Sequence, residues 1–258
     1  MGVLMSEWLK LRSVRSTAYA LGAASAGVLL GAAVAWYAAG AWDAASPAMR
    51  PHVLLSPIAP LAGWLAQLAL AVLGILSVTA EHATGTISAS LAAVPRRLRL
   101  LAARAAVVGA VALAAGQGVV FATYLVCHWI IGGRPMQFWT APASAEVPVL
   151  ASWGVSVMVF GLVGLGLGAM LRSTAAAIVA VAALWYVLPL VAPHLPSPWG
   201  RWVSAGMLIN LAPQLSGAPA LSAAHDALLS PPAALGVMAA YVALALGGAA
   251  IVLCRRDS

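Results

Sequence analysis

Residues 51–80 read PHVLLSPIAPLAGWLAQLALAVLGILSVTA, a long run without a single Asp, Glu, Lys or Arg. A helix of about 20 apolar residues is long enough to cross the hydrocarbon core of a bilayer. A basic segment, 81–104, follows this run directly, and long uncharged runs continue to alternate with short charged segments along the 258 residues. The pattern predicts an all-α integral membrane protein.

The composition excludes a soluble globular domain. Hydrophobic residues make up 63% of the chain and charged residues only 7%, whereas soluble domains have roughly 45–50% and about 25%. The chain has 13 Lys and Arg against 6 Asp and Glu. We expect these cations to be arranged around a bilayer, with membrane lipid and not nucleic acid as their partner. Two cysteines are too few for a disulfide scaffold.

The uncharged runs predict the number of membrane-spanning helices. We predict six spans, at about residues 17–40, 58–80, 102–131, 148–171, 174–192 and 232–254. A further uncharged run, 202–225, contains Asn210, Pro213 and Gln214, whose polar groups lipid could not satisfy. We therefore predict one transmembrane domain over 1–258, with an extracytoplasmic loop at 193–231 that carries short interfacial or re-entrant helices.

The arginines predict the orientation of these spans. Six spans put ten cations on the side of the termini, namely Lys10, Arg12, Arg15, Arg96, Arg97, Arg99, Arg104, Arg172, Arg255 and Arg256, and three on the other side, namely Arg50, Arg134 and Arg201. By the positive-inside rule both termini are cytoplasmic. One lysine among the 13 cations and abundant alanine fit a high-GC bacterial genome, so we expect a bacterial cytoplasmic membrane.

Several kinds of catalytic chemistry are absent from the sequence. The only lysine, Lys10, lies between leucines, so there is no P-loop, and no H-E-x-x-H motif occurs. A buried serine protease would have to combine Ser152 or Ser156 with His128, and no G-x-S-x-G supports it. We therefore expect no catalytic residue, metal site or cofactor in this chain, and an intramembrane enzyme is a distant alternative. None of the spans has a charged residue in its middle, so uphill transport would need energy from a partner.

The segment that follows the second span carries the most specific pattern. Residues 81–97 read EHATGTISASLAAVPRR, in which Ile87, Leu91 and Val94 recur at helical spacing before Pro95. These residues predict a short amphipathic helix at 81–95, parallel to the membrane. An interfacial anchor whose arginines contact anionic lipid is the simpler interpretation.

A second motif precedes the first span, and together the two resemble a known family. Residues 6–17 read SEWLKLRSVRST. This motif, the segment 81–97 and the six spans resemble the permease subunits of type-2 ATP-binding-cassette (ABC) exporters, whose inner loop typically contains Thr-Gly-Thr-Ile-Arg. His82 stands where relatives usually have an aromatic residue, and Ser88 where they usually have arginine.

The resemblance implies the roles of both motifs. Residues 81–95 would form a coupling helix that docks on a separate cytoplasmic ATPase, through Glu81, His82, Thr84, Gly85, Thr86, Ile87, Leu91, Pro95, Arg96 and Arg97. Residues 1–16 would form a connecting helix on the inner membrane surface, with Glu7, Trp8, Lys10, Arg12 and Arg15 as its functional residues. Two permease copies, expected as a homodimer, would bind two ATPase copies, which hold the ATP and Mg. Glu81 would orient the coupling helix by accepting backbone N–H bonds or by pairing with an arginine.

The resemblance also points to a substrate path along the second and fifth spans. Its expected lining is Trp64, Gln67, Ser77, Trp185 and Tyr186, and the two spans' aromatic residues could equally face lipid. Gln67, the only amide in the second span, should face protein or a cavity. Such a lining suits export of an amphipathic or hydrophobic substrate such as a drug, antibiotic, peptide or lipid. A permease for self-immunity, or for maturation of another protein such as a metalloenzyme, is the alternative.

Small-residue motifs mark places of close helix packing. Gly27 and Gly31 form one G-x-x-x-G pair on the first span, and Gly164 and Gly168 form another on the fourth. These pairs predict close contacts, either within one subunit or at a dimer interface.

Overall fold

The computed structural model describes residues 2–53, 58–83, 97–136, 139, 143–217 and 229–256, and every regular element in these ranges is helical. The long helices are α2 (Arg15–Ala44), α3 (Ile58–Ala83), α5 (Arg97–Ile131), α6 (Ala143–Leu171) and α11 (Pro231–Arg256). The shorter elements are α1 (Val3–Ser13), η1 (Arg50–His52), α7 (Thr174–Ala182), η2 (Ala183–Val187), α8 (Leu188–Val191), η3 (Ala192–His194), α9 (Trp199–Gly206), η4 (Leu208–Asn210) and α10 (Leu211–Ser216). The predicted all-α class is confirmed.

The described ranges contain six helical stretches that are long and apolar enough to cross a membrane. These are Arg15–Ala44, Pro60–Ala80, Leu98–Ile131, Ser144–Leu171, Thr174–His194 and Pro231–Arg255. They coincide with the six predicted spans, and the chain is therefore a multi-pass membrane protein. The fifth stretch is interrupted, because α7 passes through the π-helical turn η2 into α8 and η3.

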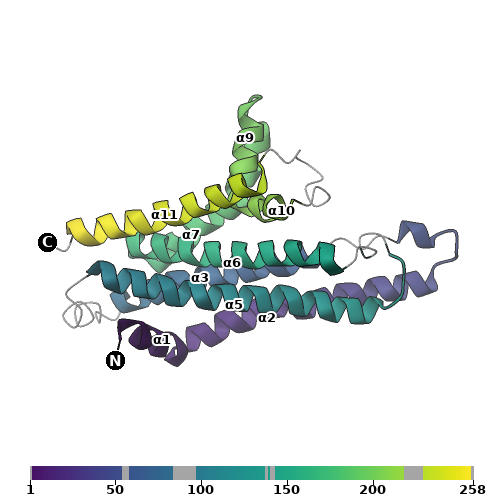
Figure 1. Cartoon of the computed structure of the whole chain (residues 1–258), viewed down its shortest axis with the longest axis horizontal. Coiled ribbons are helices and arrows are strands. Elements are labelled where there is room, and N and C mark those ends of the chain that lie inside the picture. Colours follow the sequence, from purple (N-terminus) through teal and green to yellow (C-terminus); the bar gives the residue numbers. More distant parts are fainter. Residues whose placement is uncertain are drawn as a thin grey trace.

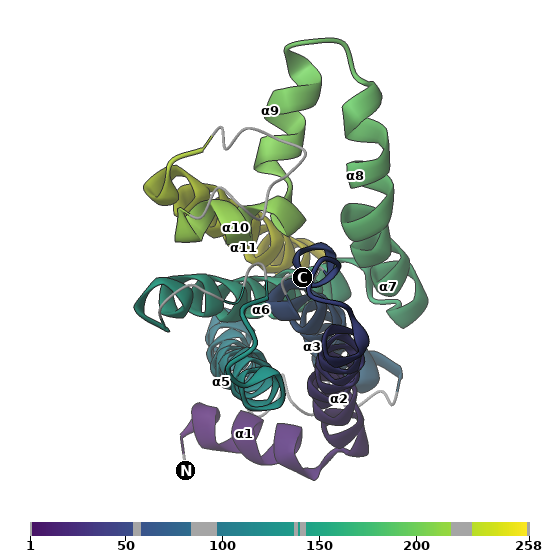
Figure 2. The same cartoon turned by 90° about the vertical axis from the view of Figure 1, so that its right-hand side faces the viewer.

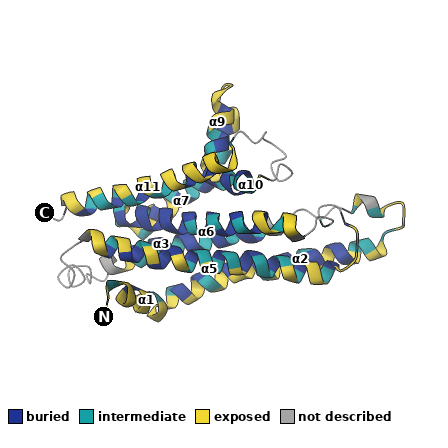
Figure 3. Ribbon diagram, viewed as in Figure 1, coloured by how far each residue is buried: buried dark blue, intermediate teal, exposed yellow. Residues whose placement is uncertain are grey.

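Helices α2, α3, α5 and α6 lie side by side along the long axis of the molecule, and both chain termini lie at one end of this bundle (Figure 1). Seen along the bundle, α11 packs beside α6 (Figure 2). Buried side chains concentrate on the faces of α3, α5 and α6 that meet one another, while α1, α9 and α11 present exposed surface (Figure 3). Large apolar side chains on the outside, such as Leu29, Trp36, Trp129 and Leu244, suit contact with lipid.

Small residues allow α3 to pack directly against its neighbours. A Cβ atom added to Gly164 of α6 would collide with the backbone carbonyl of Ala71, and one added to Gly168 would lie 3.0 Å from the carbonyl oxygen of Ile75. Gly27 of α2 faces α3 in the same way. The glycines therefore contact the backbone of α3 in the same subunit. Of the two alternatives from the sequence, packing within one subunit or at a dimer interface, the structure shows the first for these glycines.

The end of the bundle opposite the termini is joined by an ion pair. Arg134, just after α5, donates from Nη2 to Oδ2 of Asp43 at 2.6 Å and from Nε to Oδ1 at 3.0 Å. The same guanidinium also donates to the carbonyl groups of Ile130 and Ile131, which lie at the end of α5. Hydrogen bonding to the Asp43 carboxylate raises the pKa of the Arg134 guanidinium above its ordinary value. Arg134 therefore caps α5 and ties it to α2.

The predicted loop 193–231 is partly helical. Helix α9 in this loop and α8, at the end of the fifth span, project sideways from the bundle (Figures 1 and 2). Leu190 on α8 and Trp199 and Trp202 on α9 are exposed. The amide of Asn210 donates to the Ser204 carbonyl, and Gln214 uses backbone partners in the same way. These bonds satisfy the polar groups that argued against a seventh span. Residues 218–228 of the loop lie outside the described residues.

Helix α1 lies across the terminal end of the bundle, next to α5 and the start of α2 (Figure 2). Val14 has an extended backbone, with φ −91° and ψ 130°, and separates α1 from α2. The Thr17 hydroxyl donates to the Leu11 carbonyl at 2.6 Å, which satisfies one of the carbonyl groups left open at the end of α1. The chain thus turns sharply into the first spanning helix.

Candidate functional site

The predicted coupling segment lies mostly outside the described residues. Helix α3 continues through Glu81 and His82 to Ala83, and α5 begins at Arg97. The side chains of Glu81, His82 and Arg97 are not described, and Thr84, Gly85, Thr86, Ile87, Leu91, Pro95 and Arg96 fall in the undescribed range 84–96. The two helix ends that flank the segment lie at the same end of the bundle as α1 and both termini (Figure 1).

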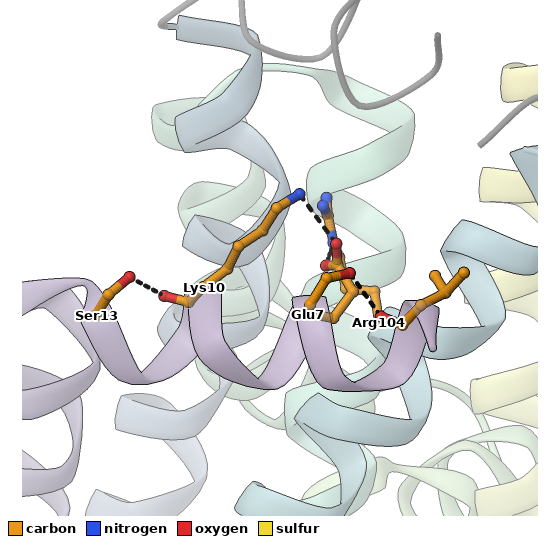
Figure 4. A network of polar contacts seen from close by, with 6 residues as sticks. Glu7, Lys10, Ser13 and Arg104 are labelled. Atoms are coloured by element: carbon orange, nitrogen blue, oxygen red, sulfur yellow. Dashed lines mark hydrogen bonds and ion pairs between the residues drawn. The ribbon is translucent and has the colours of Figure 1, made fainter. Parts of the chain in front are cut away.

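A buried ion pair fixes α1 to the bundle at this end (Figure 4). The Glu7 carboxylate accepts from Nε of Arg104 through Oε2 at 2.8 Å and from Nζ of Lys10 through Oε1 at 3.0 Å. Glu7 is 4% exposed and Arg104 is 6% exposed. A charged group withdrawn from water needs a partner of opposite charge, and each carboxylate oxygen of Glu7 has one. The first motif is thereby joined to α5.

The other predicted residues of the first motif face outward. Trp8 is 43% exposed, and Arg12 and Arg15 are also exposed. Leu4 is exposed beside Trp8, whereas Leu11 packs inward against buried residues of the bundle. The buried face of α1 is therefore centred on Glu7 and Leu11, while Trp8 and the two arginines are available to lipid or to a partner protein.

A cavity of about 490 Å³ lies between α1, the first turn of α2, α3 and α5. Its polar lining consists of Glu7, Lys10, Ser13, Ser16, Thr17, Ser77 and Arg104, and its apolar lining of Leu11, Val14, Leu73, Leu76, Ala80, Val107 and Val108. Ser77, predicted for the substrate path, belongs to this cavity. Its hydroxyl donates to the Gly74 carbonyl of its own helix.

The other residues predicted for the substrate path meet farther along the bundle. Gln67 of α3 is completely buried, donates from Nε2 to the Ser156 hydroxyl at 2.9 Å and accepts through Oε1 from the indole N–H of Trp185 at 3.3 Å. This amide therefore connects α3, α6 and the π-helical turn. Gln67 faces protein, as its isolated position in an apolar span predicted.

Aromatic side chains surround this amide. Trp64 packs edge-on against both Trp153 and Trp185, with ring centroids 6.3 Å apart in each pair, and Trp185 packs against Tyr186 at 4.3 Å. Trp153 and Trp185 are buried, whereas Trp64 is 37% and Tyr186 is 62% exposed. The exposed surface of this cluster is therefore made by Trp64 and Tyr186, and it is aromatic and uncharged.

The structure does not bring together the residues that an intramembrane serine protease would need. Ser152 donates to the Val149 carbonyl and Ser156 accepts from Gln67. The His128 ring stacks on Tyr124, and among the described residues no hydrogen bond links it to either serine. The described part of the chain also contains no group of three His, Cys, Asp or Glu residues that could hold a metal ion.

Three residues were not predicted in the contacts that they make: Arg104 at the ion pair with Glu7, and Trp153 and Ser156 at the cluster around Gln67. The sequence predicts Arg104 only as one of the ten cations on the side of the termini. Its position two residues inside the predicted span 102–131 could have indicated that it is buried. A buried guanidinium needs a carboxylate partner, so an acid near it could then have been expected. Ser156 is predicted only as a candidate serine of an intramembrane protease, and Trp153 carries no signal in a single sequence.

Comparison with known proteins adds no further information about this site. No protein-family model matches the chain, and no curated protein is significantly similar to it. Function is therefore inferred from the two sequence motifs and from the geometry of the bundle.

Proposed function

We propose that this chain is the transmembrane subunit of an ABC-type exporter, driven by a separate ATPase that binds at the terminal end of the bundle. The working unit has two permease copies and two ATPase copies in a bacterial cytoplasmic membrane. Both termini are cytoplasmic, and the ATPase holds the ATP and Mg. Residues 81–95 form the coupling helix, and α1 is the connecting helix.

The observation that carries this proposal is the ion pair between Glu7 and Arg104. Glu7 belongs to the first motif, and Arg104 lies seven residues beyond the end of the second, so the pair links α1 to the helix that follows the coupling segment. A force applied by an ATPase to the segment between α3 and α5 would reach α1 through this pair and reach α6 through the close α3 contact. The ion pair is therefore an argument that α1 and the coupling segment move together.

The aromatic cluster around Gln67 supports the choice of substrate class. Trp64 and Tyr186 offer an uncharged aromatic surface, which suits an amphipathic or hydrophobic substrate. Gln67 is fully buried and hydrogen-bonded on both sides of its amide, so it joins the path only if α7 and η2 move away from α3. Movement of these helices is the expected consequence of ATPase closure.

The first test is purification of the tagged chain from its native membrane in a mild detergent, followed by mass spectrometry. A P-loop ATPase should accompany the chain at equal stoichiometry, and scrambling residues 84–94 should remove it. Scrambling residues 46–53, at the opposite end of the bundle, is the matched control and should leave the complex intact. Purification of the chain alone from a host that expresses such ATPases would contradict the proposal.

The reconstituted complex allows a second test at Glu81. Glu81→Gln should reduce substrate-stimulated ATP hydrolysis, because the carboxylate orients the coupling helix. The reference is Glu146→Gln, which changes an acid in the first turn of α6, at the opposite end of the bundle. Equal stimulation in Glu81→Gln and the unmodified complex would remove the role proposed for Glu81.

A further inference from the structure

The elements α8, η3 and α9 form an arm, residues 188–206, that extends sideways across the direction of the long helices (Figures 1 and 2). Helices that cross a membrane run roughly along its normal, so the arm is directed along the membrane plane. Its surface is strongly apolar, with Leu190 70%, Trp199 68% and Trp202 57% exposed. Because such a surface is poorly suited to water, the depth of the arm determines what covers it.

The depth of α9 can be measured along α11. The Tyr241 hydroxyl donates to the carbonyl group of Gly206, the last residue of α9, at 3.2 Å. From Tyr241 to Arg255, the first of the two arginines that end α11, the helix rises about 21 Å at about 1.5 Å per residue. Arginines mark the edge of the hydrocarbon, which is about 30 Å thick. The end of α9 therefore lies in the half of the bilayer away from the termini.

The other foot of the arm lies at a similar depth. Next to Arg172, at the start of α7, the Thr174 hydroxyl donates to Oγ1 of Thr79 on α3 at 2.8 Å. Trp185 lies in η2, which leads directly into α8, and donates to Gln67 on α3. From Thr79 to Gln67, α3 rises about 18 Å. Both ends of the arm thus leave the bundle beyond the midplane of the bilayer.

The backbone of the arm is suited to a place without water. Prolines have no N–H group that could be left unsatisfied, and residues 188–198 contain four, namely Pro189, Pro193, Pro196 and Pro198. The N–H groups of Leu195 and Gly200 donate to the carbonyl groups of Ala192 and Pro196. A Cβ atom at Gly200 would lie 2.8 Å from the Ala192 carbonyl oxygen, so this glycine lets η3 and α9 pack closely. Internal partners of this kind are what hydrocarbon requires of a backbone.

We propose that the arm lies flat within the leaflet away from the termini and binds the phospholipid of that leaflet. The end of α9 is about 9 Å from the far edge of the hydrocarbon, within the roughly 5–10 Å by which interfacial helices enter a leaflet. Leu190 contacts acyl chains, while Trp199 and Trp202, three residues apart on one face of α9, lie at the headgroup boundary. Arg201, the arm's only Asp, Glu, Lys or Arg, is tolerated there because its long stem reaches the headgroups. This arrangement requires neither an ATPase partner nor a particular orientation of the termini.

The test is spin labelling of the full-length chain in phosphatidylglycerol and phosphatidylcholine vesicles. A nitroxide is attached at Leu190→Cys on α8 or at Trp202→Cys on α9, each in a Cys254→Ser background that leaves only the buried Cys127. Collisions of the label with oxygen, which concentrates in hydrocarbon, are compared with collisions with a water-soluble nickel complex. For both labels the ratio of oxygen to nickel collisions should be at least about fivefold above that of a label in water, because the hydrocarbon excludes the complex.

Two reference positions calibrate this ratio. Leu244→Cys reports on lipid, since Leu244 is 74% exposed on α11 between Tyr241 and Arg255, and Gly133→Cys reports on water at an exposed position beyond α5. A ratio like that of Gly133→Cys would place the arm in water and overturn the proposal. Few collisions with either probe would also overturn it, by showing the arm covered by protein such as a second copy of the chain. Leu190→Cys decides alone if Trp202→Cys fails to fold.

Discussion

Glu7 and Arg104, 97 positions apart in the chain, form a buried ion pair with 2.8 Å between Oε2 and Nε. It connects a helix at the terminal end of the bundle to a membrane-spanning helix. Besides this pair, α1 contacts the bundle through the apolar side chain of Leu11. The attachment of α1 to α5 therefore includes a buried charge pair.

We first predict that Glu7→Gln loosens α1. Removing one partner of a buried ion pair usually costs about 3–5 kcal/mol, and Arg104 would lose the carboxylate that it faces. We expect a loss near the lower end of that range in detergent unfolding, together with faster hydrogen exchange in α1. The exposed Arg12→Gln variant should show neither effect. If the two variants behaved alike, the pair would not be what holds α1.

The joint replacement of both partners should be milder than the single change. A buried ion pair can often be replaced by apolar residues at little cost, because no charge remains without its partner. Glu7→Leu combined with Arg104→Leu should therefore unfold at a higher denaturant concentration than Arg104→Leu alone. Lys10 contacts Glu7 in the single variant and loses this contact in the double variant, where water can replace it because the Lys10 side chain is 44% exposed. The difference between the two variants therefore measures the cost of burying the Glu7 carboxylate without Arg104, less the value of its contact with Lys10. Unfolding of the double variant below the single one would argue against this interpretation.

We next predict that Gln67→Leu destabilises the protein by about 1–2 kcal/mol. The change removes two hydrogen bonds and leaves the Ser156 hydroxyl and the Trp185 indole N–H buried without this partner. Unfolding of the purified chain by titration with a denaturing detergent measures the effect. Ser77→Ala is the control, because within the described part of the chain its hydroxyl bonds only to the Gly74 carbonyl of its own helix, and it should change stability far less. A loss no larger than that of the control would show that the Gln67 amide is not a structural link.

The spans were predictable from sequence because each uncharged run is long enough to identify its own helix. The helices nevertheless begin or end several residues beyond the predicted spans, as α5 does at Arg97, since flanking arginines can continue a helix while their charged ends stay outside the hydrocarbon. The π-helical turn at Ala183–Val187 left no sequence signal. Periodicity describes a regular helix and cannot identify where its hydrogen bonding shifts by one residue.

The contacts of the candidate sites were less predictable than the spans. Gln67 was expected to avoid lipid, but its partners come from two other helices and only the fold brings them together. Glu7 is the only acid before Asp43. The sequence therefore suggests that Glu7 has a basic partner, but not which residue that partner is. Thirteen cations offered candidates, and sequence spacing cannot choose among residues on separate helices.

Gly164→Val should severely reduce the yield of folded protein. A side chain at this position would collide with the Ala71 backbone, which cannot move aside without separating α6 from α3. Overpacking of this kind costs about 1–3 kcal/mol or more. Gly118→Val is the matched control, because nothing lies within 4 Å of a Cβ atom at that position of α5. Yield and elution profile in mild detergent provide the comparison, and a normal profile for Gly164→Val would contradict the close α3–α6 contact.

The native cysteines test the orientation of the bundle. No cysteine has to be introduced at the end that holds the termini, because Cys254 lies there. Cys254 is exposed near the end of α11, whereas Cys127 is completely buried in α5. If the termini are cytoplasmic, a membrane-impermeant maleimide should leave Cys254 unlabelled in intact spheroplasts and label it after permeabilisation. Cys127 should react only after denaturation.

A cysteine at the opposite end completes the topology experiment. Gly133 is exposed and nothing lies within 4 Å of a Cβ atom there, so Gly133→Cys in a Cys254→Ser background should fold normally and label in intact spheroplasts. With six spans the two reporters lie on opposite sides of the membrane. Cys254 should therefore gain labelling on permeabilisation, whereas Gly133→Cys should be labelled before it. The reverse pattern would place the arginine-rich end outside, against the positive-inside rule. An ATPase could then not reach the segment between α3 and α5, and the proposed function would fail with the topology.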